Sequence, residues 1–169
     1  MRYLPLVAAM LLPCGVANAQ VTQSVSGELQ VKLLVSASCE VSGSSSGGVG
    51  TALLDFGSTA LLLEAIDADT GTGVNALRVL CNPGVAYTLT FDAGQNATAV
   101  ADRAMRLQGG SDLVAYQLYS DASRATVLES LSGTGTGTAD VVTVYGRVPA
   151  QAAPPPGTYT DVVTVTVTF

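Results

Sequence analysis

The chain has 169 residues, enough for one domain of ordinary size, with 48% hydrophobic and 12% charged residues. That balance excludes an intrinsically disordered protein, because disordered chains are rich in charge and poor in apolar residues. The net charge of −6 and the absence of histidine argue against nucleic-acid binding, against a histidine-based catalytic site and against a histidine-containing metal centre.

The N-terminus carries the pattern of an export signal. Arg2 supplies a positive charge, and an apolar stretch follows from Leu4 to Leu12. The small-residue motif that ends at Ala19 predicts cleavage between Ala19 and Gln20. The apolar stretch is shorter than the roughly 20 residues that span a bilayer, so we expect export rather than membrane insertion.

Two cysteines remain after removal of this signal, because Cys14 leaves with it. Cys39 and Cys81 are 42 residues apart, in a chain predicted to fold in an oxidising compartment. Two cysteines without histidine do not make a structural zinc site, and a catalytic thiol would lack its base. The sequence therefore predicts a structural disulfide between them.

The first predicted element after the signal is a long alternating segment from Val21 to Val35. Its odd positions are mostly apolar and its even positions mostly polar. An extended segment of this length spans roughly 50 Å, whereas sandwich strands usually have about 3–10 residues. We therefore expect part of the segment to reach beyond its own domain.

Short strands separated by turns follow along the rest of the chain. Loops are expected at 42–48, 82–84, 133–138 and 154–157, where glycine, serine and proline gather. The predicted strands are Ala52–Phe56, Ala76–Cys81, Ala86–Asp92, Arg103–Leu107, Leu113–Ser120, Val141–Val148 and Tyr159–Phe169, with a less regular stretch at 61–73. About seven short strands without an amphipathic helix predict a β-sandwich.

The two ends of the chain share an unusual property. The last predicted strand alternates valine and threonine up to Phe169, so we expect an unprotected sheet edge there. A half-apolar extension and an open apolar edge are an aggregation hazard in one molecule. They are explained if the extension of one copy adds a strand to the edge of the next.

Several segments, in their order and spacing, are similar to those of a known family. They are Ser38-Cys39-Glu40-Val41, Leu54-Asp55-Phe56-Gly57, Val79-Leu80-Cys81, Tyr87-Thr88-Leu89, Val114 to Asp121, Tyr145 to Pro149, and Pro156 to Asp161. With the signal and the alternating N-terminal stretch, they resemble the spore coat protein U domain family, the subunits of archaic (Csu-type) chaperone–usher pili. The resemblance covers essentially the whole mature chain.

The resemblance implies an all-β fold, an incomplete immunoglobulin-like β-sandwich that lacks its last strand and is completed by donor-strand complementation. A periplasmic chaperone would supply a strand at first. An outer-membrane usher would then exchange it for the N-terminal extension of an identical or related pilin subunit.

The same resemblance assigns roles along the chain. Residues 1–19 would be the signal peptide, 20–37 the donor-strand extension and 38–169 the pilin domain. The donor plugs would be Val25, Leu29, Val31, Leu33 and Val35. One wall of the acceptor groove, facing the chaperone, would be formed by Val163, Val165, Val167 and Phe169.

The resulting expectation is a non-enzymatic subunit of a fimbrium on the cell surface, exported through the periplasm, with a role in adhesion and biofilm formation and without a cofactor. Two alternatives stay open: a secreted coat or surface-layer protein, and a monomeric adhesin or carbohydrate-binding module. A carbohydrate-binding module would bind sugars by stacking them on aromatic side chains, but aromatic residues make up only 5% of the chain.

The acidic stretch at 67–71 is interpreted as a solvated loop, because its glycine falls one position early for a calcium loop.

Overall fold

The computed structural model describes residues 23–43, 51–74 and 76–169. The predicted signal peptide and its cleavage site at Ala19 and Gln20 lie outside these residues. The chain divides into two units, of which the first ends at Leu34 and the second runs from Val35 to Phe169.

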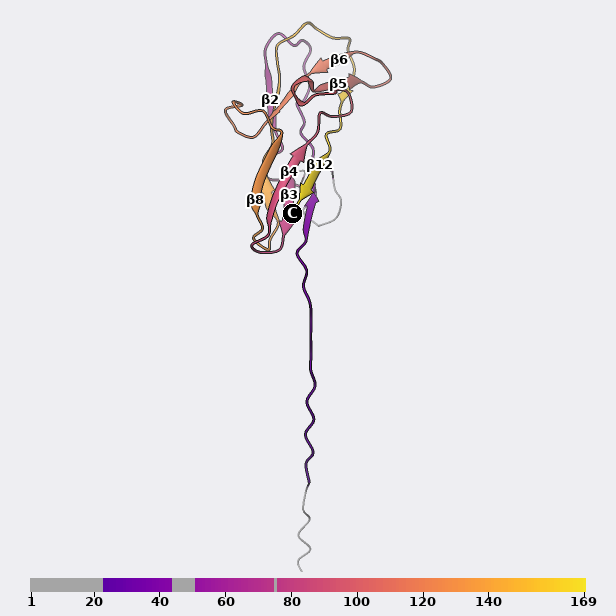
Figure 1. Cartoon of the computed structure of the whole chain (residues 1–169). Coiled ribbons are helices and arrows are strands. Elements are labelled where there is room, and N and C mark those ends of the chain that lie inside the picture. Colours follow the sequence, from indigo (N-terminus) through magenta and orange to yellow (C-terminus); the bar gives the residue numbers. More distant parts are fainter. Residues whose placement is uncertain (1–22, 44–50, 75) are drawn as a thin grey trace, which may run out of the picture. The chain divides into compact units, whose positions relative to one another are not determined.

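The described part of the first unit, residues 23–34, is an extended trace without helix or strand (Figure 1). Its side chains are exposed, including Val25 at 97% and Leu29 at 88%. The segment is therefore extended, as the alternating pattern predicts, but in the described residues it pairs with no other strand.

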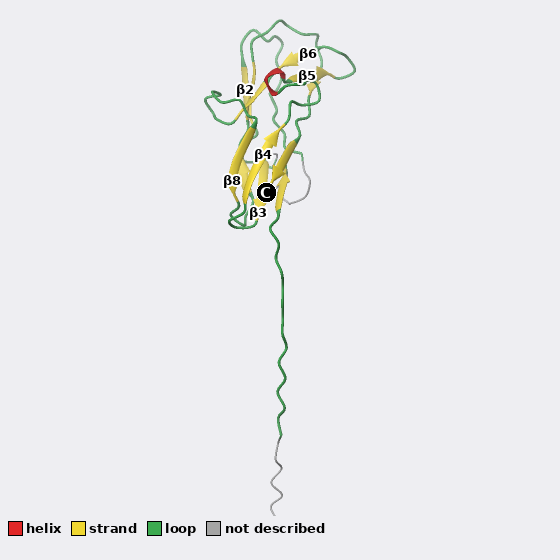
Figure 2. Ribbon diagram, viewed as in Figure 1, coloured by secondary structure: helices red, strands yellow, loops and turns green. Residues whose placement is uncertain are grey.

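The second unit is built from short strands and one 3₁₀ helix, η1 (Val100–Asp102), among the residues described (Figure 2). The strands are β1 (Cys39–Ser42), β2 (Ile66–Asp69), β3 (Leu77–Cys81), β4 (Ala86–Phe91), β5 (Ala104–Leu107), β6 (Leu113–Ala115), β7 (Gln117–Tyr119), β8 (Ser130–Thr134), β9 (Asp140–Val142), β10 (Tyr145–Val148), β11 (Tyr159–Thr160) and β12 (Val165–Thr168). No helix in this part of the chain has the length and apolar character needed to cross a membrane.

The strands form antiparallel sheets of three strands each. The sheet orders are β1-β3-β9, β2-β10-β7, β11-β5-β6 and β12-β4-β8. Strands β1, β9, β8 and β12 are therefore edge strands, which matters for the site described below.

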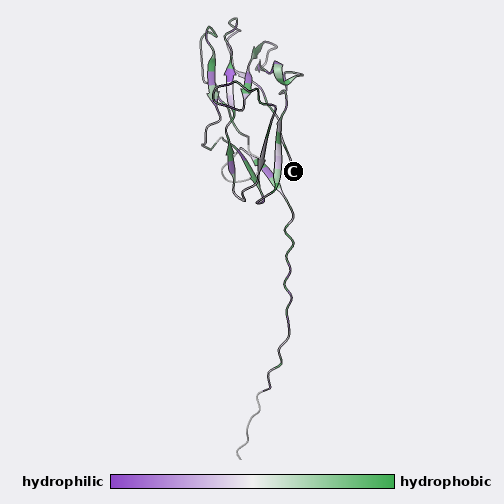
Figure 3. Cartoon of the chain, turned by 60° about the vertical axis from the view of Figure 1, so that its left-hand side comes forward, coloured by the Kyte–Doolittle hydropathy of each residue, from purple (hydrophilic) through white to green (hydrophobic). Residues whose placement is uncertain are grey.

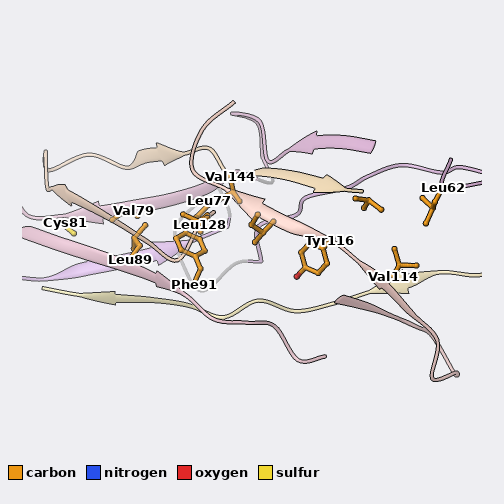
Figure 4. Close-up of a cluster of buried hydrophobic side chains, with 12 residues drawn as sticks. Leu62, Leu77, Val79, Cys81, Leu89, Phe91, Val114, Tyr116, Leu128 and Val144 are labelled. Carbon is orange, nitrogen blue, oxygen red and sulfur yellow. The ribbon is translucent and has the colours of Figure 1, made fainter. Parts of the chain in front are cut away.

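The core lies between these sheets. Along β3, Leu77, Val79 and Cys81 are buried, and they face the buried Leu89 and Phe91 of β4 (Figure 4). Polar residues alternate with apolar ones along the strands, as the colours in Figure 3 show. This alternation is the pattern of a strand with one face in a core and one face in water.

Three predicted strands are each divided in two, because the chain changes sheet halfway along. In the Leu113–Ser120 segment, β6 pairs with β5 while β7 pairs with β10 in another sheet. Tyr116 stands at the crossover, where its N–H donates to the Arg103 carbonyl at 3.0 Å. Segments 141–148 and 159–169 switch sheets in the same way.

Other predictions also differ from the structure. The stretch at 67–71, expected to be a solvated loop, belongs to β2 as far as Asp69, because its backbone pairs with β10. Ala52–Phe56 forms no strand, although alternate residues pack against the core. Strand β8 includes Gly133, which was expected in a loop. Gly133 fits there because the ring of Tyr87 fills its side-chain space, with Cζ 2.5 Å from where a Cβ would lie.

Candidate functional site: the edge of strand β12

Among the described residues, strand β12 is bonded to its sheet along one edge only. It pairs with β4 in the register Val165↔Phe91 and Val167↔Leu89. The Asp92 N–H donates to the Thr164 carbonyl at 3.1 Å. Thr164 and every second residue after it, Thr166 and Thr168, therefore direct their backbone N–H and C=O groups toward β4. Val165 and Val167 therefore direct theirs to the opposite edge, where no strand pairs within the described ranges.

Strand β1 lies beside this open edge (Figure 1). The Cα atoms of β1 and β12 approach within 8 Å, yet the two strands belong to different sheets. The core is incompletely covered beside this edge. Val41 of β1 and Val165 of β12 are only partly buried, whereas Leu89 on the neighbouring strand is 0% exposed.

The side chains of the C-terminal segment alternate as its sequence predicts. Val163, Val165 and Val167 pack against the core, while the threonines between them are exposed. Phe169 follows the last residue of β12 and is 58% exposed. A strand added at this edge would cover the three valines and bond their outward N–H and C=O groups.

The predicted donor residues are apolar and exposed. Leu29, Val31 and Leu33 are 85–88% exposed, and Val25 and Val35 are 97% and 68% exposed. These five side chains share the odd positions of an extended segment, so they would lie on one face of a strand. The chain thus contains both an apolar strand face without a partner and a sheet edge that such a face could cover.

The disulfide predicted between Cys39 and Cys81 is present, which confirms that prediction. It joins the first residue of β1 to the last residue of β3, two residues that lie opposite each other in the ladder. The bond therefore holds the short edge strand β1 against the interior of its sheet.

Aspartates that the sequence analysis did not single out anchor the start of β12. The Asp92 Oδ1 accepts bonds from the N–H groups of Gly94 and Thr164, both at 2.9 Å. Partial desolvation of Asp92 raises its pKa, but these two bonds, a bond to the Thr164 side chain and the positive charge of Arg103 together outweigh that effect, so the pKa lies below its usual value. The sequence signal was the Asp-x-Gly pattern directly after a predicted strand, which is typical of a turn.

Asp161 reaches back to the same turn. Its Oδ1 accepts from the Gln95 N–H at 2.9 Å and from Asn96 Nδ2 at 2.8 Å, and its Oδ2 accepts from the Tyr116 hydroxyl at 2.7 Å. Burial and the bond to Asp161 raise the pKa of Tyr116 well above its usual value, so the phenol stays protonated.

Arg103 lies beneath this turn with 1% of its surface exposed. Its guanidinium donates to the carbonyls of Asp92 at 2.7 Å, Leu128 at 3.1 Å and Phe91 at 3.3 Å, and to Gln117 Oε1 at 2.9 Å. Burial lowers the pKa of Arg103. The side chain ties together the backbone at the end of β4 and before β8.

The carboxylates of the 67–71 stretch have other partners. Asp67 forms ion pairs with Arg147 at 2.7 Å and Arg124 at 3.2 Å, and Asp69 accepts the Gly71 N–H at 2.7 Å. In the described part of the chain, no group of three histidine, cysteine or acidic residues could hold a metal ion.

Comparison with known proteins identifies relatives of this chain. The Spore Coat Protein U domain model matches residues 25–166. The chain is 34% identical over 135 residues to Protein U of Myxococcus xanthus, covering 72% of this chain and 74% of that protein.

Among solved structures, a similar chain belongs to the pre-assembly complex of the chaperone CsuC with the tip adhesion subunit CsuE, from the archaic chaperone–usher Csu pili of Acinetobacter baumannii. The TM-score is 0.52 with 20% identity, over 80% of this chain and 40% of that chain. The likeness is one of fold, and with the antiparallel sheets described above it confirms the predicted all-β fold class.

Proposed function

The chain belongs to the spore coat protein U domain family, and on this premise we propose that it is a structural subunit of a surface pilus assembled by the chaperone–usher route. The observation that carries the proposal is the pairing of two features in one chain. One is the exposed alternating apolar face at residues 25–35, and the other is the incompletely covered core at the edge of β12.

In the proposed assembly, residues 20–37 of one copy add a strand to β12 of the next, and residues 38–169 form the pilin domain. Leu29, Val31 and Leu33 would then be buried, and each buried side chain of this size contributes about 1.5–3 kcal/mol. Three of them contribute about 5–9 kcal/mol before the cost of association. Backbone bonds to the outward groups of Val165 and Val167 add to this and fix the register.

The linker between the donor segment and β1 favours addition to another copy. Only Ser36, Ala37 and Ser38 separate Val35 from Cys39. A tight hairpin that returned the segment to its own β1 would favour glycine, asparagine or aspartate in the turn, because these residues adopt positive φ. The linker has none of them.

Before assembly, the edge of β12 needs temporary cover, because an open edge with apolar side chains promotes aggregation. In our proposal a periplasmic chaperone provides this cover with a strand of its own, and an outer-membrane usher exchanges that strand for the donor segment. The assembled fibre would lie on the cell surface and contribute to adhesion and biofilm formation. Its role is structural rather than enzymatic.

The test is a variant with Leu29→Asp, Val31→Asp and Leu33→Asp. Because the donor segment is exposed, we expect this variant to fold and form its disulfide but to give no fibres by electron microscopy and no SDS-resistant ladder. The matched control, Ser24→Asp, Ser26→Asp and Gln30→Asp, adds the same charge on the polar face and should still polymerise.

Two results would contradict the proposal. One is a misfolded triple Asp variant beside a folded control, which would mean that the three apolar side chains belong to their own domain core. The other is an unchanged ladder. Wild-type assemblies that form two-dimensional layers instead of fibres would support a coat or surface-layer protein.

A further inference from the structure

We propose that Asp92 and Asp161 clasp the start of β12 to the body of the domain, so that β12 is already in position when a donor strand arrives. This inference rests on the proposed function, because it concerns the edge to which the donor adds. We call this set of contacts the aspartate clasp. Asp92 accepts a bond from the Thr164 N–H. Asp161 accepts bonds from the Gln95 N–H, the Asn96 side-chain amide and the Tyr116 hydroxyl.

The turn at Asp92, the first half of the clasp, makes one bond that similar turns in the same chain do not make. Asp55, Asp69 and Asp92 each precede a glycine by two residues, and each accepts that glycine's N–H at 2.7–2.9 Å. Among these three turns, Asp92 is the one that also accepts a bond from a distant segment, from the Thr164 N–H at 2.9 Å just before β12. Asp92 therefore does more than close its own turn.

The second half of the clasp runs in the opposite direction. Asp161 precedes β12 and accepts bonds from Gln95, Asn96 and the buried Tyr116. Its carboxylate packs so closely on Gly94 that a Cβ there would lie 2.0 Å from Oδ2, and Gly94 also has a φ of +82°. The turn at 92–96 and the segment at 161–164 are thus bonded to each other from both sides.

Arg103 fixes the clasp to the core. Its guanidinium holds the Asp92 carbonyl at 2.7 Å, while the Asp92 N–H and carboxylate both engage Thr164. Every polar group of the Asp92 backbone is therefore used. The position of Thr164, one residue before β12, is therefore set by Asp92 directly, and the buried Arg103 holds Asp92 in turn.

Such an anchor matters because β12 is a four-residue edge strand that, in the described part of the chain, has a ladder on one side only. Edge segments with few bonds open locally and exchange their amides quickly. A donor that had to order β12 while binding would bind more weakly, because binding would bear that ordering cost. Asp92 is thus a positioning residue for strand addition.

The experiment uses the full chain carrying the triple Asp donor substitutions, so that its own extension does not compete. The probe is a synthetic peptide of residues 21–37, and the variants are Asp92→Ala and Asp92→Asn. Asp69→Ala is the matched control, because it removes the same type of turn bond at the end of β2, which pairs with β10 in a different sheet from β12.

We expect Asp92→Ala to weaken peptide binding by about tenfold or more, as loss of a charge-assisted bond implies. Asp92→Asn keeps an oxygen acceptor and should restore most of the binding. Asp69→Ala should bind as the unsubstituted background does. Without peptide, amide hydrogen exchange at 163–168 should accelerate in Asp92→Ala and not in Asp69→Ala.

Unchanged exchange at 163–168 in Asp92→Ala would overturn the clasp, whether or not peptide binds. Equal peptide binding by Asp92→Ala and the background would overturn it as well. If the background itself does not bind peptide while exchange responds as expected, the clasp stands as an anchor of β12 and the proposed strand addition fails.

Discussion

Removal of the Cys39–Cys81 disulfide should destabilise the domain by about 4 kcal/mol. The bond closes a loop of 42 residues, and the chain-entropy model gives about that value for such a loop. Domains of this size are typically stable by about 5–15 kcal/mol, so the loss is a large fraction of the total. In the folded state, the four-residue strand β1 also loses its covalent attachment at Cys39.

The perturbation is the double variant Cys39→Ala and Cys81→Ala, which leaves neither partner of the disulfide as a free thiol. The assay is urea unfolding of the wild type and the variant, with the unfolding free energy taken from midpoint and slope. Wild type treated with a reductant serves as the control and should unfold like the variant. A decrease below about 1 kcal/mol would refute the reasoning, because it would mean that the loop is not constrained by this bond.

Two further predictions concern the C-terminal edge and acid. Phe169→Asp should change the unfolding free energy by less than about 0.5 kcal/mol, because the ring is 58% exposed, but should reduce binding of the 21–37 peptide; undiminished binding would remove Phe169 from the acceptor edge. Bonds from the Ser123 hydroxyl and the Thr126 and Ala125 N–H groups lower the pKa of Asp121 to about 2. Because this pKa is lower in the folded state than in the unfolded state, ionised Asp121 stabilises the folded protein at pH values above its unfolded pKa of about 3.9. This stabilisation is lost as the pH falls to about 2, so urea midpoints should decline across that range less steeply in Asp121→Asn, and parallel declines would contradict this.

The elements that the sequence predicted well are those in which one strand stays in one sheet. Ala76–Cys81 and Ala86–Asp92 match β3 and β4 closely, since each of these strands lies at the centre of its sheet. The cysteine pairing was predictable because, outside the predicted export signal, the chain has two cysteines and no histidine to give them a metal-binding or catalytic role.

Where the chain passes from one sheet to another, the alternation of apolar and polar residues continues without a break. The sequence pattern therefore gives no sign that the strand is divided there. Residues such as Tyr116 and Val144 are apolar and buried, so nothing in the period-2 pattern marks them as crossover points. The aspartate clasp was hidden for another reason. Asp92 and Asp161 are 69 positions apart in the chain, and Asp-x-Gly turns at 55–57 and 69–71 look the same in sequence. Only the fold shows which of them meets a strand.

The central claim is that the donor segment of one copy lies beside β12 of another, and a disulfide trap tests it most directly. Three full-length variants would combine Val165→Cys with Leu29→Cys, Val31→Cys or Leu33→Cys, because opposed side chains on adjacent strands have Cβ atoms about 4.5–5.5 Å apart. Val165→Cys with Gln30→Cys, on the opposite face, is the control. We predict that at least one pair gives a covalent multi-subunit ladder on non-reducing gels, which collapses on reduction, and that the control gives none. Absence of a ladder from all three pairs, or a disulfide closed within a single chain, would contradict the account.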